Sequence, residues 1–148
     1  MRRRNSAHFL MTSSDIEFKE TRDLSLESVI ALYKCVGWSS AEKPEALHKG
    51  LMNSHSLVTA WCGDRLVGLA NALSDGHLVV YYSHVLVHPE FQGRGIATRL
   101  MQMLMAHYHG FHQHVVIADG RAIDFFRKCG FKRAGNTESM WIYAGHDH

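Results

Sequence analysis

The chain has 148 residues, a length that fits one domain of ordinary size. Its 16 lysines and arginines nearly balance 14 acidic residues, which argues against a protein that neutralises a nucleic-acid backbone. Hydrophobic residues make up 46% of the sequence, so a disordered chain is excluded, and no apolar run reaches the roughly 20 residues that span a bilayer. We therefore expect a globular protein without nucleic-acid or membrane partners.

The first half of the chain predicts a strand, two helices and a hairpin. Residues 1–14 are polar and basic, and we interpret them as a flexible tail. Apolar and charged residues alternate over 16–20, which predicts a half-buried strand. Apolar residues at helical spacing predict helices over 26–36 and 44–51, the second with a proline in its first turn. Strand-like segments joined by a Gly-Asp turn then predict a hairpin over 56–70.

The second half alternates strands and helices. We expect a strand over 78–87, a helix over 95–108, a strand over 115–117, a helix over 121–128 and a last strand over 140–143. This order predicts one α/β (α+β) domain, residues 15–144, with a central mixed sheet flanked by helices and a short tail at 145–148.

Histidines and cysteines give no metal or disulfide framework. Cys35, Cys62 and Cys129 are odd in number and far apart, so a reducing, cytoplasmic location is the simplest expectation. Twelve histidines include a cluster at residues 107–114, but this run lacks cysteine or carboxylate partners at regular spacing. We predict no metal site.

The most informative stretch is residues 85–97, where a strand ends, a short loop carries two glycines and a long helix begins. Glycines allow close approach to a ligand, and the unpaired first amides of a helix favour phosphate. A Walker loop is excluded because its Gly-Lys-Ser/Thr is absent, and Thr98 replaces the third glycine of a dinucleotide fingerprint. Gln92, Gly95 and Ala97 instead fit the pyrophosphate cradle Gln/Arg-x-x-Gly-x-Gly/Ala, with a purely structural turn as the alternative.

This stretch and a second block at 118–131, which ends in Gly-Phe, resemble the GNAT superfamily of acyl-CoA-dependent N-acetyltransferases. The resemblance extends over residues 16–143. It is greatest for the small single-domain branch that includes plant-type serotonin N-acetyltransferases, through residues 36–38, 84–93 and 118–131. It implies a single-domain GNAT fold with a mostly antiparallel sheet that splays between its fourth and fifth strands. A homodimer is compatible with the family.

The resemblance also implies acetyl-CoA as co-substrate. The backbone of strand residues 85–87 would pair with the pantetheine arm, and the amides of residues 92–98 would hold the pyrophosphate. Asp119 replaces an asparagine that often touches the cofactor, and Phe126 replaces the tyrosine that usually serves as general acid. The implied cofactor-binding residues are Val85, Leu86, Val87, Gln92, Gly93, Arg94, Gly95, Ile96, Ala97, Thr98, Asp119 and Phe126.

Transfer to an amine requires a neutral nitrogen, so a base must take a proton directly or through water. His84 occupies the position of the acidic base in the resembled branch, and its ordinary pKa of about 6.5 suits that task; a histidine merely hydrogen-bonded on a sheet face is the alternative. Strand alternation places Tyr81 and Ser83 on the face opposite His84, and both stay candidates. Tyr143 is a candidate proton donor to the thiolate.

We therefore predict an N-acetyltransferase that moves the acetyl group of acetyl-CoA to a primary amine of a small molecule, by direct attack and without an acyl-enzyme. The alternatives are acetylation of a protein N-terminus or lysine, and a non-catalytic CoA-binding regulatory domain, which Phe126 makes worth testing. Nothing in the sequence ranks the acceptor amines.

Overall fold

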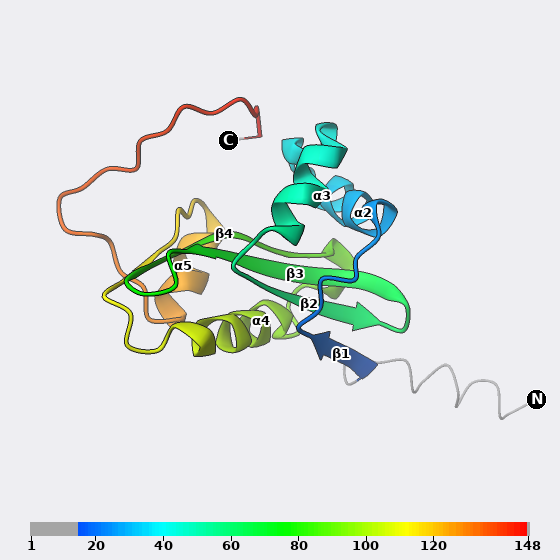
Figure 1. The fold of residues 1–148 in the computed structure, drawn as a ribbon, viewed down its shortest axis with the longest axis horizontal. Coiled ribbons are helices and arrows are strands. Elements are labelled where there is room, and N and C mark those ends of the chain that lie inside the picture. Colours follow the sequence, from blue (N-terminus) through cyan, green and yellow to red (C-terminus); the bar gives the residue numbers. More distant parts are fainter. Residues whose placement is uncertain (1–14, 148) are drawn as a thin grey trace, which may run out of the picture.

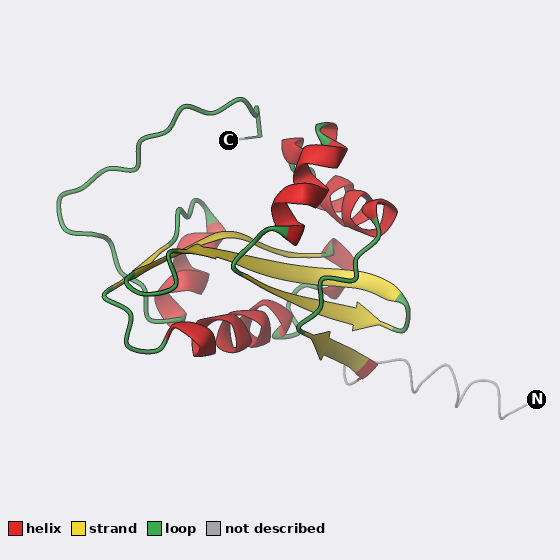
Figure 2. Cartoon of the chain, in the orientation of Figure 1, coloured by secondary structure: helices red, strands yellow, loops and turns green. Residues whose placement is uncertain are grey.

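The computed structural model describes residues 15–147, so the predicted tail at 1–14 lies outside the described residues. Within the described part, no helix is long and apolar enough to cross a membrane. The elements follow the predicted order, except for the last strand (Figures 1 and 2). The strands are β1 (Ile16–Lys19), β2 (Ser56–Cys62), β3 (Arg65–Ser74), β4 (Val79–Val87) and β5 (Gln113–Val115), and the helices are α2 (Leu26–Val36), α3 (Pro44–Met52), α4 (Ile96–Met105) and α5 (Arg121–Lys128).

The strands form one mixed sheet in the order β1-β2-β3-β4-β5. Every pairing is antiparallel except that of β4 with β5, which is parallel. Only Val79–Tyr81 of β4 pair with β5. Beyond Tyr81, no described strand pairs with this edge of β4, so the two strands diverge. The predicted splay between the fourth and fifth strands is confirmed.

Helices cover both faces of the sheet (Figure 1). On one face, α2 and α3 bury an apolar cluster that includes Leu32 and Leu51 against Leu69 and Leu86 of the sheet. On the other face, α4 and α5 form a second cluster, to which α4 contributes Leu100 among others. The amphipathic spacing of the helical residues therefore places one apolar stripe of each helix against the sheet.

Gly68 of β3 marks a close contact between the sheet and α4. A Cβ atom at this position would lie 3.3 Å from side-chain atoms of Ile96 and Leu100 and from the carbonyl oxygen of Leu86. We expect Gly68→Val to lower the free energy of unfolding by about 1–3 kcal/mol, because the added methyl groups overpack this contact. Gly50 in α3 has open space around it, so Gly50→Ala is the matched control and should stabilise by about 0.5–1 kcal/mol. Urea denaturation measures the free energy of unfolding of both variants. Equal effects of the two substitutions would contradict the close contact at Gly68.

The predicted last strand, over residues 140–143, is wrong. The chain after α5 runs in an arc away from the sheet, and Met140, Trp141 and Ile142 are exposed (Figure 2). High β-propensity produces a strand only where a ladder partner is available. The tip of this segment is held instead by polar contacts with the 3-10 turn Ser39–Glu42.

Candidate active site

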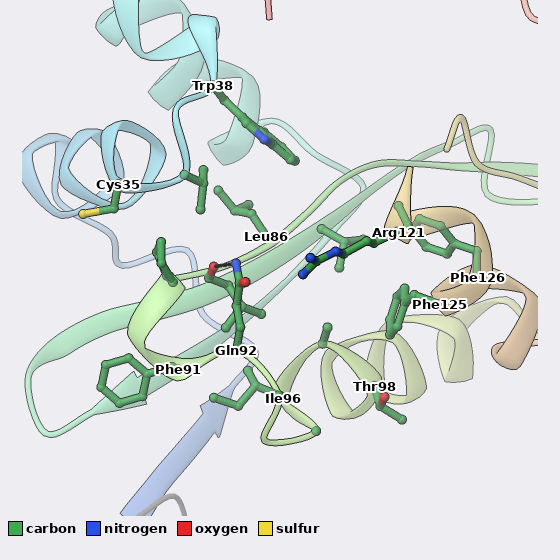
Figure 3. Close-up of a pocket in the computed structure, with 18 residues that line it drawn as sticks. Cys35, Trp38, Leu86, Phe91, Gln92, Ile96, Thr98, Arg121, Phe125 and Phe126 are labelled. Carbon is green, nitrogen blue, oxygen red and sulfur yellow. Dashed lines mark hydrogen bonds between the residues drawn. The ribbon is translucent and has the colours of Figure 1, made fainter. Parts of the chain in front are cut away.

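A cavity of about 640 Å³ opens where β4 separates from β5, between β4, the loop after it, α4 and α5. Figure 3 shows the lining side chains, which come from three segments of the chain, residues 35–38, 85–98 and 121–126. It is lined by Cys35, Val36, Trp38, Val85, Leu86, Val87, Pro89, Phe91, Gln92, Gly93, Gly95, Ile96, Ala97, Thr98, Arg121, Ala122, Phe125 and Phe126. All the predicted cofactor-binding residues line it except Arg94 and Asp119.

The glycine turn forms one end of the cavity. Gly93 and Gly95 have φ angles of 77° and 79°, in the left-handed region that favours glycine, and Gly95 directly precedes α4. This geometry leaves the first amides of α4 directed at the cavity mouth, where the helix dipole is positive. The side-chain amide of Gln92 donates to the carbonyl of Val87 at 3.0 Å, which ties the turn to the end of β4.

Arg121, at the first position of α5, is the one charged side chain among the lining residues. Figure 3 shows its guanidinium extending across the cavity toward Gln92. Arg94, in contrast, lies over the ring of Phe91 at 5.3 Å and does not line the cavity. Asp119 does not line it either, and its carbonyl accepts a hydrogen bond from the amide of Ala122 at the start of α5. The cation that faces this cavity is therefore Arg121 and not the predicted Arg94.

A second cavity, of about 330 Å³, lies between α3 and the middle of β3 and β4. Its walls are largely apolar, and its polar groups come from the turn before α3, from Asn71 of β3 and from β4. It is lined by Ser40, Lys43, Ala46, Leu47, Gly50, Leu51, Asn71, Leu73, Ser83 and His84. The ring of His84 lies 5.3 Å from that of Trp38, which lines the first cavity, so these two rings lie between the two cavities.

The His84 side chain is held by α2. Its Nδ1 lies 2.7 Å from the hydroxyl of Tyr33, a residue that is fully buried. Burial removes water from the imidazolium form and lowers the pKa of His84 to about 4, while the carboxylate of Asp147 acts in the opposite direction. His84 is therefore neutral at neutral pH.

Asn71 fixes the backbone of β4 beside His84. Its Oδ1 accepts hydrogen bonds from Ser83 Oγ at 2.9 Å and from the amide of His84 at 2.8 Å, and its Nδ2 donates to Ser54 Oγ. The β3–β4 register shifts at this point, because β4 bulges by one residue. Ser83 and His84 consequently line the same cavity, and the predicted opposite orientation of Ser83 is wrong.

Comparison with known proteins identifies the fold and its chemistry. The family model described as an acetyltransferase (GNAT) domain matches residues 20–140. The chain belongs to the GNAT acetyltransferases. An uncharacterized ycf52-like N-acetyltransferase of Prochlorococcus marinus is 30% identical over 133 residues, covering 84% of this chain and 73% of the relative.

Solved GNAT structures share the architecture. A GNAT family acetyltransferase of Streptococcus pneumoniae superposes with a TM-score of 0.73 at 28% identity, covering 87% of this chain and 98% of that one. AAC(6')-Iy, solved in complex with the bisubstrate analogue CoA-S-monomethyl-acetylneamine, superposes with a TM-score of 0.64 at 17% identity, covering 86% of this chain and 96% of that one, which is a likeness of fold. The chain is thus an acyl-CoA-dependent N-acetyltransferase with a GNAT fold.

Acetyl-CoA fits the first cavity of this GNAT chain. The turn at Gly93 and Gly95 can accommodate a phosphate because nothing lies within 4 Å of either position where a side chain would start. Arg121 would supply the complementary charge, and no described strand pairs with this edge of β4 beyond Tyr81, which leaves room for a pantetheine arm alongside it. Phe126 lines the cavity and packs edge-on against Phe125 and Phe131, so it offers an apolar surface and no proton.

The remaining predicted catalytic residues lie outside both cavities. Tyr81 is half-buried and precedes the bulge, between two residues of the α4-side core, Val80 and Tyr82. Tyr143 is 43% exposed, and its hydroxyl donates to Asp147 at 2.8 Å and lies 3.4 Å from Ser39 Oγ. It therefore belongs to the tip of the C-terminal segment and does not reach the cavity that holds Phe126.

The histidine cluster at residues 107–114 makes ordinary contacts. His107 lies 2.8 Å from Glu20, and His114 lies 2.8 Å from the hydroxyl of Tyr82. Between residues 15 and 147, no three potential ligands come together in an arrangement that would hold a metal ion.

Sequence reasoning missed two residues of the site. Arg121 was not predicted because its role depends on its position at the start of α5, which only the fold places beside the cavity. Tyr33 was counted with the apolar stripe of its helix. A buried tyrosine needs a hydrogen-bond partner, and this requirement was the one signal in the sequence that pointed beyond packing.

Proposed function

We propose that this GNAT enzyme transfers the acetyl group of acetyl-CoA, bound in the first cavity, to a small primary amine bound in the second, by direct attack of the amine on the thioester. The observation that carries the proposal is the contact between Trp38 and His84. Their rings are 5.3 Å apart and each lines one of the two cavities, so the reacting groups of two ligands would meet at this contact.

The residues present orient the cofactor. The pyrophosphate would lie on the amides of the turn after β4 and near Arg121, and the pantetheine arm would run back along the free edge of Val85–Val87. This direction takes the thioester end toward His84, upstream in β4. Acetyl-CoA supplies an activated acyl group whose thiolate, with an ordinary thiol pKa of about 8.5, leaves without a strong acid. The absence of a hydroxyl at Phe126 is therefore compatible with turnover.

The second cavity supports a small acceptor with an apolar body. Its volume of about 330 Å³ is in the range of small-molecule sites, and Leu47, Leu51 and Leu73 line it. Next to this cavity, the ring of Trp38 contacts His84 from the side of the first cavity and offers an aromatic face, which attracts amines while they are protonated. Arylalkylamines meet this description, in agreement with the resemblance to serotonin N-acetyltransferases, and tryptamine is the natural first probe.

The proposal is tested by measuring release of CoA thiol from acetyl-CoA with a panel of acceptors. The panel contains tryptamine, spermidine, an aminoglycoside, a peptide with a free N-terminus and a peptide with an internal lysine. We expect kcat/KM to be highest with tryptamine. Turnover of the peptides alone would assign the enzyme to protein acetylation. Binding of CoA, seen as a rise in melting temperature, without turnover of any amine would identify a regulatory domain.

Arg121 offers a prediction that does not depend on the acceptor. Charge-assisted hydrogen bonds to phosphate contribute about 1.5–3 kcal/mol, so Arg121→Gln is expected to weaken CoA binding by roughly 10–100-fold in calorimetric titration. Arg94→Gln is the matched control, because Arg94 stacks on Phe91 outside the cavity, and its change should leave the affinity within about threefold. Pantetheine, which lacks the phosphates, should bind Arg121→Gln and the unaltered protein equally well. A larger loss in Arg94→Gln than in Arg121→Gln would contradict this assignment.

A further inference from the structure

The hydrogen bond between Tyr33 and His84 joins two groups that are removed from water. Tyr33 on α2 is fully buried, and its hydroxyl lies 2.7 Å from Nδ1 of His84. Burial raises the pKa of Tyr33 far above its ordinary value of about 10, so the phenol keeps its proton. Among the described residues, His84 Nδ1 is the one hydrogen-bond partner of this hydroxyl.

The position of the protons follows from this pairing. A buried hydroxyl donor without an acceptor costs free energy, and His84 Nδ1 is the acceptor in reach. If Tyr33 donates to Nδ1, this nitrogen carries no proton. A neutral imidazole then carries its proton on Nε2. Donation in the reverse direction, from Nδ1 to the phenol oxygen, would leave the phenol proton without a partner inside the core.

A second tyrosine–histidine pair in the same protein has the opposite arrangement. His55 Nδ1 lies 2.7 Å from the hydroxyl of Tyr108, at the distance found for Tyr33 and His84. The Tyr108 hydroxyl, however, donates its proton to Ser56 Oγ at 2.6 Å. His55 must therefore donate from Nδ1. The acceptor to which each tyrosine donates therefore determines which ring nitrogen of the paired histidine carries the proton.

From this geometry we infer that Tyr33 is a positioning residue that holds His84 in the Nε2–H form, so that His84 acts as a hydrogen-bond donor to the thioester oxygen and not as the base that deprotonates the amine. The inference rests on the proposed function for the identity of that oxygen. As the amine attacks, the carbonyl carbon becomes tetrahedral and its oxygen gains negative charge. An N–H donor that is already in place stabilises this charge without reorganisation.

The surroundings of His84 agree with a donor. Two charged groups act near His84: Lys43, which lines the same cavity, and Asp147, whose carboxylate acts on His84 from the C-terminal segment. The backbone amide of His84 donates to Asn71 Oδ1, so the residue is fixed at its main chain as well as at Nδ1. The amine proton then leaves to water or through the acceptor cavity, with no residue of this pair as its receiver.

Nitrogen-15 NMR of the full chain without ligands tests the proton position, using histidine labelled in the ring and long-range correlations at pH about 8, above the ordinary histidine pKa of about 6.5. Protonated and unprotonated ring nitrogens give distinct shifts. His48 is an internal reference for the Nε2–H form because its Nε2 lies 2.7 Å from the carbonyl of Leu24, which can only accept. His55 is the reference for the Nδ1–H form. The His84 signals are assigned by their loss in His84→Gln.

We expect His84 to show the pattern of His48, with Nε2 protonated and Nδ1 unprotonated. The pattern of His55 at this residue would overturn the inference, while leaving acetyl transfer itself untouched because no substrate is present. In Tyr33→Phe, Nδ1 loses its donor, and the two forms should interconvert and give averaged shifts. Unchanged His84 shifts in Tyr33→Phe would show that Tyr33 does not hold the histidine.

A kinetic comparison separates positioning from simple loss of stability. Tyr33→Phe is expected to lower kcat with tryptamine by roughly 3–10-fold, the effect of one hydrogen bond, with the KM for acetyl-CoA unchanged. Tyr82→Phe is the matched control, because it removes a similar bond to His114 on the opposite face of the sheet. Equal losses of kcat in the two variants would overturn the positioning role.

Discussion

Replacing His84 by alanine is expected to lower kcat for acetyl transfer to tryptamine by roughly 100-fold, the effect of removing one preorganised oxyanion donor. The KM for acetyl-CoA should change little, because the pyrophosphate turn and Arg121 lie at the other end of the first cavity. Steady-state kinetics with both substrates varied measures these quantities separately. A loss confined to the KM of the amine would place the His84 bond on the acceptor and not on the thioester oxygen.

His84→Gln distinguishes a donor from a base at the same position. The glutamine amide presents an N–H group near the place of Nε2 but has no basicity in water. If His84 is a donor, the glutamine variant should retain at least about a tenth of the original kcat, well above the alanine variant. If His84 is a base, both variants should be equally slow. This comparison is independent of the NMR measurement, so each can contradict the other.

The elements could be predicted because their signals are local. The helix at Leu26–Val36 was predicted to the residue, since its apolar spacing and the glycine that follows it lie within one segment. The glycine turn before α4 was predicted for the same reason, because its two glycines lie close together in sequence between a strand and a helix. The strand at 140–143 failed because its formation depends on an edge partner elsewhere in the chain.

The candidate site depends on contacts that sequence spacing does not encode. Tyr33 and His84 are separated by 51 positions and meet only because α2 packs on β4. The orientation of Ser83 depends on a bulge that the Asn71 side chain stabilises from the neighbouring strand. Simple alternation along β4 cannot reveal this, because one inserted residue reverses the faces of all the residues beyond it.

The charge at the cofactor cavity shows a similar limit. Arg94 lies in the glycine turn and is the obvious phosphate ligand by sequence. In the structure, Arg94 instead lies 5.3 Å from the centre of the Phe91 ring, which Arg65 also contacts at 5.6 Å. Arg121 comes from the opposite side of the cavity, where α5 begins. Adjacency in sequence therefore predicted a set of residues that line the cavity, whereas the cation that lines it comes from an element that only the fold brings near.

The buried state of His84 should also make the stability of the protein depend on pH. In the folded protein its pKa is lowered to about 4 because burial desolvates the imidazolium, whereas in the unfolded chain it titrates near 6.5. Between these pH values the imidazole is protonated in the unfolded chain but not in the folded protein. The free energy of unfolding therefore falls as the pH falls from about 6.5 to 4, and it levels off below that range. The contribution amounts to about 3 kcal/mol between pH 7 and pH 4.

Urea denaturation of the original protein and of His84→Gln at pH 7, 5.5 and 4 isolates this contribution, because all other titrating groups are shared. The stability of the original protein relative to the variant is expected to fall by about 3 kcal/mol across the series. The carboxylate of Asp147 raises the pKa of His84 and so opposes the effect of burial. Asp147→Asn should consequently steepen the fall of stability below pH 6.5. Parallel pH curves for the original protein and His84→Gln would contradict the lowered pKa of His84, because they would mean that the imidazole takes up its proton as readily in the folded protein as in the unfolded chain.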